Sequence, residues 1–187
     1  MPVLTNEYLN GLIELFKNVV LFLEEKNINY WIDGGTLLGC VRSQGQIKHD
    51  DDADLAMFEI DLLSFLEHAK ELAERYDYLI TAHGGLIKIA NQKIYRMSEK
   101  IEDARLAATV DICLYHKEDD NIILSLPQHQ DLWPDAYHRD QDFEPFRREK
   151  YEDIEVWSVS NPEPYLERFY GPDWRVERDV PSETHTN

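Results

Sequence analysis

The sequence is poor in cysteine and in basic residues. Only two cysteines, Cys40 and Cys113, occur among 187 residues, and they lie far apart and outside any CxxC pair. Neither a disulfide framework nor a cysteine-ligated zinc site is therefore expected. Lysine and arginine total 19 against 37 aspartates and glutamates, which gives a formal net charge of −18. This balance excludes a general nucleic-acid binder, because phosphate backbones require clustered basic side chains.

Long apolar runs are also missing. The most apolar early stretch, residues 12–23, is interrupted by Glu14, Lys17 and Asn18, and the first residues, MPVLTNEYLNG, contain no basic segment. These features predict neither a membrane span nor a signal peptide, and we expect a cytoplasmic protein. The length is typical of one domain, so we expect a single unit over residues 1–180 with a flexible tail at 181–187.

Periodicity predicts an α/β fold, a mixed sheet flanked by helices. Apolar residues at helical spacing predict helices over residues 6–26 and 61–76, a helix starting near Thr36, and a short helix capped by Asn161. Strand-like segments are residues 28–33, 52–58, 78–81, 85–90, 108–115, 121–126 and 154–159. Residues 127–150 mix proline, aromatics and charges without a period, which predicts an irregular connection that shapes a binding rim.

The most unusual segment is IKHDDDADLAM at residues 47–57, with four carboxylates in five positions: Asp50, Asp51, Asp52 and Asp54. At an effective dielectric near 20, two carboxylates about 5 Å apart repel each other by roughly 3 kcal/mol. Water, a cation or a basic side chain must offset this repulsion. The alternation after the run places Asp52 and Asp54 on one face of a strand and the intervening apolar residues on the other.

Two further features complete a candidate site. Asp111 interrupts the apolar strand ATVDICLY, where burial would be costly without a cation or hydrogen bonds. Gly34 and Gly35 precede a helix start, where a glycine turn lets the backbone approach a phosphate and directs free N–H groups at it. Carboxylates for a pair of divalent ions and a turn for phosphate predict phosphoryl or nucleotidyl transfer.

The same features have simpler interpretations. A run of aspartates alone is typical of a solvated loop, but the apolar alternation after it and the glycines before it argue against this. A calcium loop is disfavoured because Leu55 stands where glycine is needed and Asp61 where glutamate belongs. We interpret His49 as structural, Trp157 as a core residue, and YGPDW at residues 170–174 as a buttress of the fold.

The arrangement resembles the nucleotidyltransferase fold of the polymerase-beta type, in which a glycine pair at a helix start precedes DxD on one strand and a third aspartate on a later strand. The block WIDGGTLLGCVRSQGQIKHDDDADLAM resembles the signature of the LicD/fukutin family. GGLIKI, VDICLY and PEPYLERFYGPDW agree with it, so the resemblance covers roughly residues 27–175. This sequence departs from the family by having Lys48 and His49 in place of a Pro-Trp pair, and by lacking the cysteine-ligated zinc loop of some eukaryotic relatives.

The resemblance implies a transferase that moves a phospho-alditol or phosphocholine unit from a CDP-linked donor to a carbohydrate hydroxyl of a surface glycan. It also implies that three catalytic residues hold Mg²⁺ or Mn²⁺: Asp52, Asp54 and Asp111. Five residues are predicted to bind phosphate: Gly34, Gly35, Thr36, Arg42 and Lys88.

Alternatives stay open at this point. Arg42 has an equal claim as a partner of the acidic run, and Lys88 as a solvated charge at a strand edge. The same fold and carboxylates also suit an antibiotic-type nucleotidyltransferase that uses an NTP. A catalytically silent nucleotide-binding module is disfavoured because all three metal-site positions are aspartate.

Overall fold

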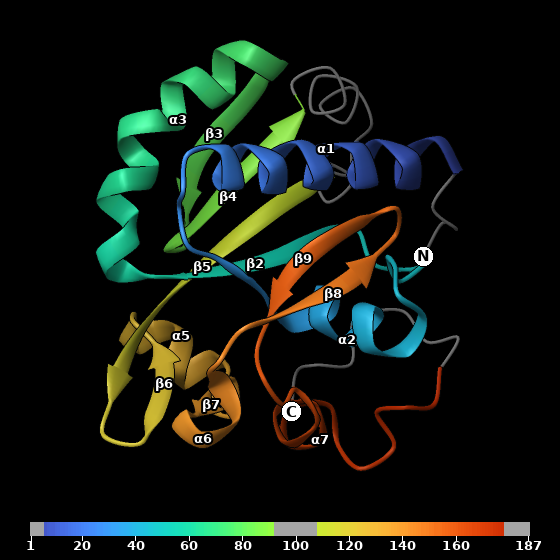
Figure 1. Cartoon of the computed structure of the whole chain (residues 1–187), viewed down its shortest axis with the longest axis vertical. Coiled ribbons are helices and arrows are strands. Elements are labelled where there is room, and N and C mark those ends of the chain that lie inside the picture. Colours follow the sequence, from blue (N-terminus) through green and yellow to red (C-terminus); the bar gives the residue numbers. More distant parts are fainter. Residues whose placement is uncertain (1–5, 92–107, 178–187) are drawn as a thin grey trace.

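The computed structural model describes residues 6–91 and 108–177, which form a mixed α/β structure (Figure 1). This confirms the predicted fold class. The helices are α1 (Asn6–Glu25), α2 (Gly34–Ser43), the 3-10 turn η1 (Glu59–Asp61), α3 (Leu62–Tyr76), α5 (Pro127–Leu132), α6 (Asp140–Phe143) and α7 (Glu163–Tyr170). The strands are β1 (Trp31–Ile32), β2 (Asp52–Phe58), β3 (Tyr78–His83), β4 (Leu86–Asn91), β5 (Thr109–Glu118), β6 (Asn121–Leu124), β7 (His138–Arg139), β8 (Arg147–Tyr151) and β9 (Ile154–Ser158).

Seven strands form the main sheet, in the order β1-β2-β5-β4-β3, with β6 paired to β5 and β7 paired to β6. The central strands β2 and β5 run parallel, from Asp52 opposite Thr109 to Phe58 opposite Tyr115. The other described pairs are antiparallel. β8 and β9 form a separate two-stranded sheet, here called the β8–β9 hairpin, which packs against β1 and α2.

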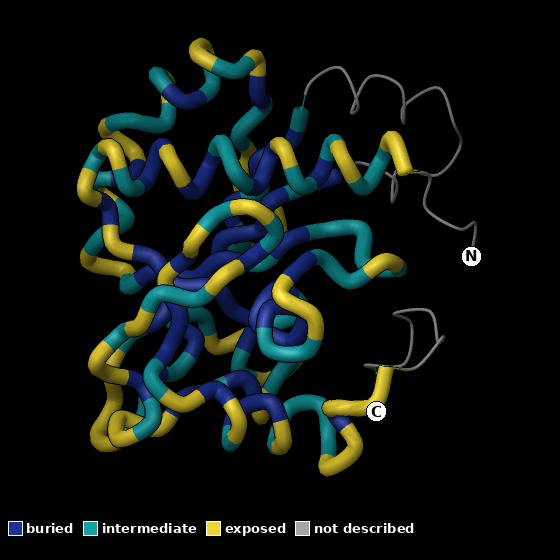
Figure 2. The backbone as a smooth tube through the Cα atoms, turned by 45° about the vertical axis from the view of Figure 1, so that its right-hand side comes forward, coloured by how far each residue is buried: buried dark blue, intermediate teal, exposed yellow. Residues whose placement is uncertain are grey.

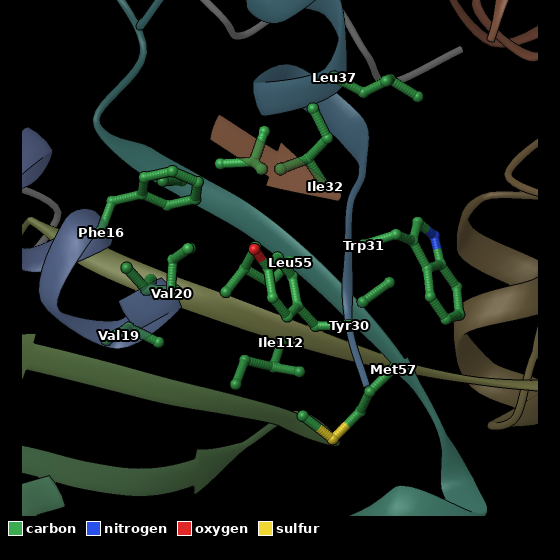
Figure 3. Packing of buried hydrophobic residues seen from close by; sticks show 14 of the residues in the cluster. Phe16, Val19, Val20, Tyr30, Trp31, Ile32, Leu37, Leu55, Met57 and Ile112 are labelled. Atoms are coloured by element: carbon green, nitrogen blue, oxygen red, sulfur yellow. The ribbon is translucent and has the colours of Figure 1, made fainter. Parts of the chain in front are cut away.

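One face of the main sheet is apolar and lies against α1. The predicted alternation is confirmed here, because Ala53, Leu55 and Met57 of β2 are completely buried. Figure 3 shows Val19 and Val20 of α1 beside the side chains of this face. In Figure 2 the buried residues concentrate in the strands, whereas α1 alternates between buried and exposed positions along its length. The polar face of β2 is thereby left to the opposite side, next to the start of α2.

Residues 127–150 are not the irregular connection that the sequence predicted. They contain α5, β7, α6 and most of β8. α5 has six residues, β7 two and α6 four, and such elements are too short to show a helical or strand period. The predicted tail at 181–187 lies outside the described residues.

Two local predictions are also wrong. α7 has Pro162, not Asn161, at its cap position, and the Asn161 side chain donates to Asp142 Oδ1 at 3.0 Å. Trp157 is 36% exposed rather than a core residue, and the Arg148 guanidinium lies over its ring at 4.7 Å. Within the described part of the chain, no helix combines the length and apolarity that crossing a bilayer requires.

Candidate active site

The register of the central strands collects the predicted residues on one face of the sheet. Asp54 of β2 lies directly opposite Asp111 of β5, and Lys88 of β4 lies opposite Asp111 on its other side. Asp52 shares the face of Asp54, since side chains two positions apart point the same way. Three strands that are distant in sequence therefore bring three carboxylates and one ammonium group to a common face.

The glycine turn rests on Asp54. The backbone N–H of Gly35 donates to Asp54 Oδ2 at 2.7 Å, and the backbone N–H of Asp54 donates to Thr36 Oγ1 at 2.7 Å. Gly34 has φ +48°, and a Cβ there would lie 2.6 Å from Asp54 Oδ2, while a Cβ on Gly35 would collide with Asp50 Oδ2. Only glycine at both positions permits this approach of turn and carboxylates. The Gly35 N–H and the Thr36 hydroxyl thus have protein partners, and their predicted contacts to phosphate stay predictions.

The carboxylates strongly perturb one another. Burial, followed by the charge of Asp54, raises the pKa of Asp52 well above its usual range. Burial, followed by the charge of Asp50, does the same to the pKa of Asp54. For Asp50, burial and the charge of Asp51 raise the pKa to about 6. Raised pKa values in a group of carboxylates indicate that too little positive charge lies nearby to offset their burial and mutual repulsion.

The surroundings of Asp111 also indicate that positive charge is lacking at this site. Its side chain is 6% exposed, and Lys88 Nζ forms an ion pair with Oδ2. Oδ1 is buried and has no hydrogen-bond partner in the described structure. An orphaned oxygen next to mutually repelling carboxylates suits a hard divalent cation such as Mg²⁺, which takes oxygen ligands. Carboxylate oxygens in this arrangement suit the predicted metal, and which of them hold it stays a prediction.

The tightest group of carboxylates is not the predicted set. Among the described residues, Asp50, Asp51 and Asp52 each place one oxygen within 4.8 Å of the others. The predicted set of Asp52, Asp54 and Asp111 shares only Asp52 with this group. Asp50 was not predicted as a site residue, although it belongs to the acidic run that the sequence singled out.

A cavity of about 350 Å³ opens beside the glycine turn. Gly34, Gly35, Asp50 and Asp54 line it, together with Arg42 and His49. Six aromatic side chains also line it and are here called the aromatic wall: Tyr115, Trp133, Tyr165, Phe169, Tyr170 and Trp174. The segment YGPDW was expected only to buttress the fold, but Tyr170, Asp173 and Trp174 belong to the cavity wall.

Arg42 of α2 connects the cavity lining to the C-terminal segment. Its Nε donates to the carbonyl of Trp174, and its Nη2 donates to the carbonyl of Val176 at 3.3 Å. Arg42 therefore holds residues 174–176 against α2 while also lining the cavity. The predicted contact between Arg42 and phosphate stays a prediction.

A buried polar network that the sequence did not reveal lies behind the glycine turn. Asp33 accepts hydrogen bonds on both carboxylate oxygens. Tyr115 Oη donates to Oδ2 at 2.6 Å, and His138 Nε2 donates to Oδ1 at 3.1 Å. Asp33 is 4% and His138 2% exposed, and the His138 ring stacks on Tyr165 at 4.3 Å. Asp33 could have been found by a related signal, a charge directly after an apolar strand; His138 carries no such signal.

The mixed sheet, the glycine turn and the gathered aspartates agree with the predicted nucleotidyltransferase fold. The chain belongs to the LicD/FKTN/FKRP family, whose nucleotidyltransferase domain matches residues 27–159. The match confirms the family resemblance and the predicted fold, and the domain is a transferase domain.

Two curated relatives come from Rickettsia. The uncharacterized protein RP689 of Rickettsia prowazekii (strain Madrid E) is 30% identical over 164 residues, covering 88% of this chain and 55% of the relative. The uncharacterized protein RT0683 of Rickettsia typhi (strain ATCC VR-144 / Wilmington) is 32% identical over 167 residues, covering 88% of this chain and 46% of the relative. The chain thus spans about half the length of these relatives.

Among solved structures, the antibiotic-resistance factor ANT(2'')-Ia aligns with a TM-score of 0.41 and 11% identity. The alignment covers 63% of this chain and 54% of that chain.

Proposed function

We propose that this chain is a metal-dependent transferase that moves a phospho-substituent, of the phospho-alditol or phosphocholine type, from a CDP-linked donor to a carbohydrate hydroxyl in surface glycan synthesis. The observation that carries the proposal is the contact between the glycine turn and Asp54, beside a cavity of about 350 Å³. A cavity of this volume accommodates a small-molecule ligand. Family membership supports the transfer of a phosphate-bearing group.

The charges around the cavity support the need for a metal. Four carboxylates line the cavity, those of Asp33, Asp50, Asp54 and Asp173. A CDP-linked donor is anionic, so these carboxylates would repel it unless cations intervene. In our proposal Asp52, Asp54 and Asp111 hold Mg²⁺ or Mn²⁺, and Asp50 adds negative charge beside them. When bound, the ions supply charge neutralisation at the transferred phosphate and lower the pKa of the acceptor hydroxyl.

The remaining residues orient the donor and exclude water. The glycine turn fixes Asp54 through the Gly35 N–H, which keeps one carboxylate oxygen in a set direction before any ligand arrives. The aromatic wall offers rings on which a base or a sugar can stack. Arg42 lines the cavity and Lys88 pairs with Asp111, and both are proposed to contact the donor phosphates.

A substrate screen tests the proposal. The full chain is incubated with Mg²⁺ and either CDP-ribitol, CDP-glycerol, CDP-choline or each of the four NTPs, with a mixture of sugar acceptors, and consumption is read by mass spectrometry. We expect consumption of a CDP-linked donor that depends on Mg²⁺. Asp54→Asn removes one charge and keeps the oxygen that the Gly35 N–H contacts, so this variant should lose turnover while it stays folded.

Each other outcome contradicts the proposal in a different way. Consumption of an NTP without consumption of a CDP-linked donor would identify a small-molecule nucleotidyltransferase. Tight binding of a nucleotide without metal and without turnover would identify a silent binding module. Unchanged turnover in Asp54→Asn would remove the acidic site from the reaction. A cytoplasmic location stays a prediction.

A further inference from the structure

The backbone that carries the acidic run is held by side chains at three consecutive carbonyl groups. Gln46 Nε2 donates to the carbonyl of Asp52 at 2.8 Å and to that of Asp50 at 3.4 Å. Between them, Tyr8 of α1 donates its hydroxyl to the carbonyl of Asp51 at 2.7 Å. The segment from residue 44 to residue 52, here called the acidic loop, is therefore fixed at the residues that bring the carboxylates together.

Gln46 is itself held by the β8–β9 hairpin. The Tyr151 hydroxyl donates to Gln46 Oε1 at 2.6 Å, and the backbone N–H of Gln46 donates to Glu152 Oε1 at 2.8 Å. The backbone N–H of Glu152 donates to the carbonyl of Gln44 at 2.7 Å. The Tyr151 side chain is completely buried and its ring lies 4.9 Å from that of Phe16. Gln46 thus transmits the rigid position of a buried tyrosine to the acidic loop.

These hydrogen bonds hold the acidic loop in place against the repulsion between its carboxylates. The carboxylates of Asp50, Asp51 and Asp52 lie within 4.8 Å of one another and repel each other. An unclamped loop relieves that repulsion by moving them apart, and a cation must then reorder the loop when it binds. A loop that is already ordered avoids this entropic cost, so the cation binds more tightly.

We infer that Gln46 is a positioning residue for the cation site. Its hydrogen bonds connect the acidic loop to the β8–β9 hairpin and so fix the position of the carboxylates. This inference rests on the proposed function, because it requires that Asp52, whose carbonyl Gln46 holds, binds a divalent cation together with Asp54 and Asp111. The orphaned Oδ1 of Asp111 on the neighbouring strand is an independent sign of such a site. Gln46 does not line the cavity, so its effect passes through the backbone of the acidic loop.

The test is a Mg²⁺ titration of the full chain followed by thermal unfolding, which needs no substrate. Gln46→Met keeps the length of the side chain and removes its donors and acceptor. We expect the Mg²⁺ concentration that gives half of the thermal shift to rise by about tenfold, because the variant loses both hydrogen bonds from Gln46 Nε2 to the carbonyls of the acidic loop. Tyr151→Phe keeps the buried ring and removes only the anchor of Gln46, and a smaller rise of about threefold is expected from one such bond.

A matched control separates positioning from general stability. Asn18 Nδ2 donates to Tyr78 Oη at 2.9 Å, a partly buried bond away from the acidic loop. Asn18→Ala should lower the melting temperature but leave the half-saturating Mg²⁺ concentration unchanged. The inference is overturned if wild-type protein responds to Mg²⁺ and both Gln46→Met and Tyr151→Phe respond at the wild-type concentration. If the wild-type protein shows no response to Mg²⁺ or Mn²⁺, the proposed metal site itself is wrong and the inference falls with it.

Discussion

The backbone N–H of Gly35 donates a hydrogen bond to Oδ2 of Asp54 at 2.7 Å. This contact connects the first turn of α2 to the central strand β2, and it depends on the lack of a side chain at residue 35. A Cβ there would collide with Asp50 Oδ2 and lie 3.2 Å from Asp54 Oδ2. The glycine turn and the carboxylates therefore form one unit, in which neither part can change without displacing the other.

Gly35→Ala should accordingly disrupt the site. The added methyl group must push Asp50 or Asp54 away, so we expect turnover to fall by at least about tenfold, as small displacements of positioned groups commonly cost that much or more. Gly11→Ala makes the same chemical change inside α1, where alanine is favoured over glycine by about 0.5–1 kcal/mol. Steady-state kinetics and melting temperatures of both variants check the prediction. Equal activity of Gly35→Ala and wild type would show that the turn does not control the carboxylates.

Lys88 and Asp111 form the second testable relationship. Lys88 Nζ neutralises the buried Asp111 on one oxygen while the other has no partner in the described structure. Lys88→Met leaves a charged, buried carboxylate without its cation, which should destabilise the metal-free protein by about 1–3 kcal/mol. For a protein of this size, each kcal/mol corresponds to a fall of about 2–4 °C in melting temperature.

Mg²⁺ should compensate for the lost ammonium group. We therefore expect the thermal shift that Mg²⁺ produces to be larger in Lys88→Met than in wild type, because the ion then supplies the charge that Lys88 supplied. Lys88→Arg keeps the positive charge and should behave like the wild-type protein. Lys88→Met/Asp111→Asn removes both charges and should recover stability without metal. A Lys88→Met variant with wild-type stability and a wild-type Mg²⁺ response would show that the pair contributes nothing.

The sequence predicted the parts of this site that depend on a strand period. The two-residue alternation placed Asp52 and Asp54 on one face of β2 and Ala53 and Leu55 in the core, and the burial of the two apolar residues agrees. Asp111 was predicted from its chemistry, since a charge inside an apolar strand requires a partner. Local pattern and the cost of burying a charge sufficed for these residues.

The remaining parts depend on contacts that no local pattern contains. Tyr115 and His138 are 82 and 105 positions from Asp33 in the sequence. Gln46 is separated from its two partners in the β8–β9 hairpin by 106 and 105 positions. The aromatic wall combines Trp133 with residues of α7 and the segment that follows it. These pairings arise only when the sheet and its surrounding helices are assembled, so the sequence indicated the chemistry of the site better than the shape of the cavity.

The last prediction concerns an ion-pair network that joins α1 to α3, away from the acidic site. Arg75 Nη1 lies 2.6 Å from Glu25 Oε2, and Lys26 Nζ lies 2.8 Å from Glu71 Oε2. The hydrogen bonds from Arg75, with a smaller contribution from Lys26, lower the pKa of Glu25 from 4.5 to about 2. The folded protein therefore holds Glu25 ionised at a pH where the unfolded chain protonates it.

This difference sets the direction of the pH dependence. Because the folded-state pKa is the lower one, the stabilisation from Glu25 is complete above about pH 4.5 and is lost as the pH falls towards 2. Glu25→Gln should have a lower melting temperature than wild type at pH 7, and the difference should shrink at pH 3 and in 1 M NaCl, where exposed charges are screened. Glu67→Gln, at an exposed position of α3 outside this network, is the control and should show neither trend. A difference between Glu25→Gln and wild type that stays constant from pH 7 to pH 3 would mean that the ion pairs do not stabilise the contact between the two helices.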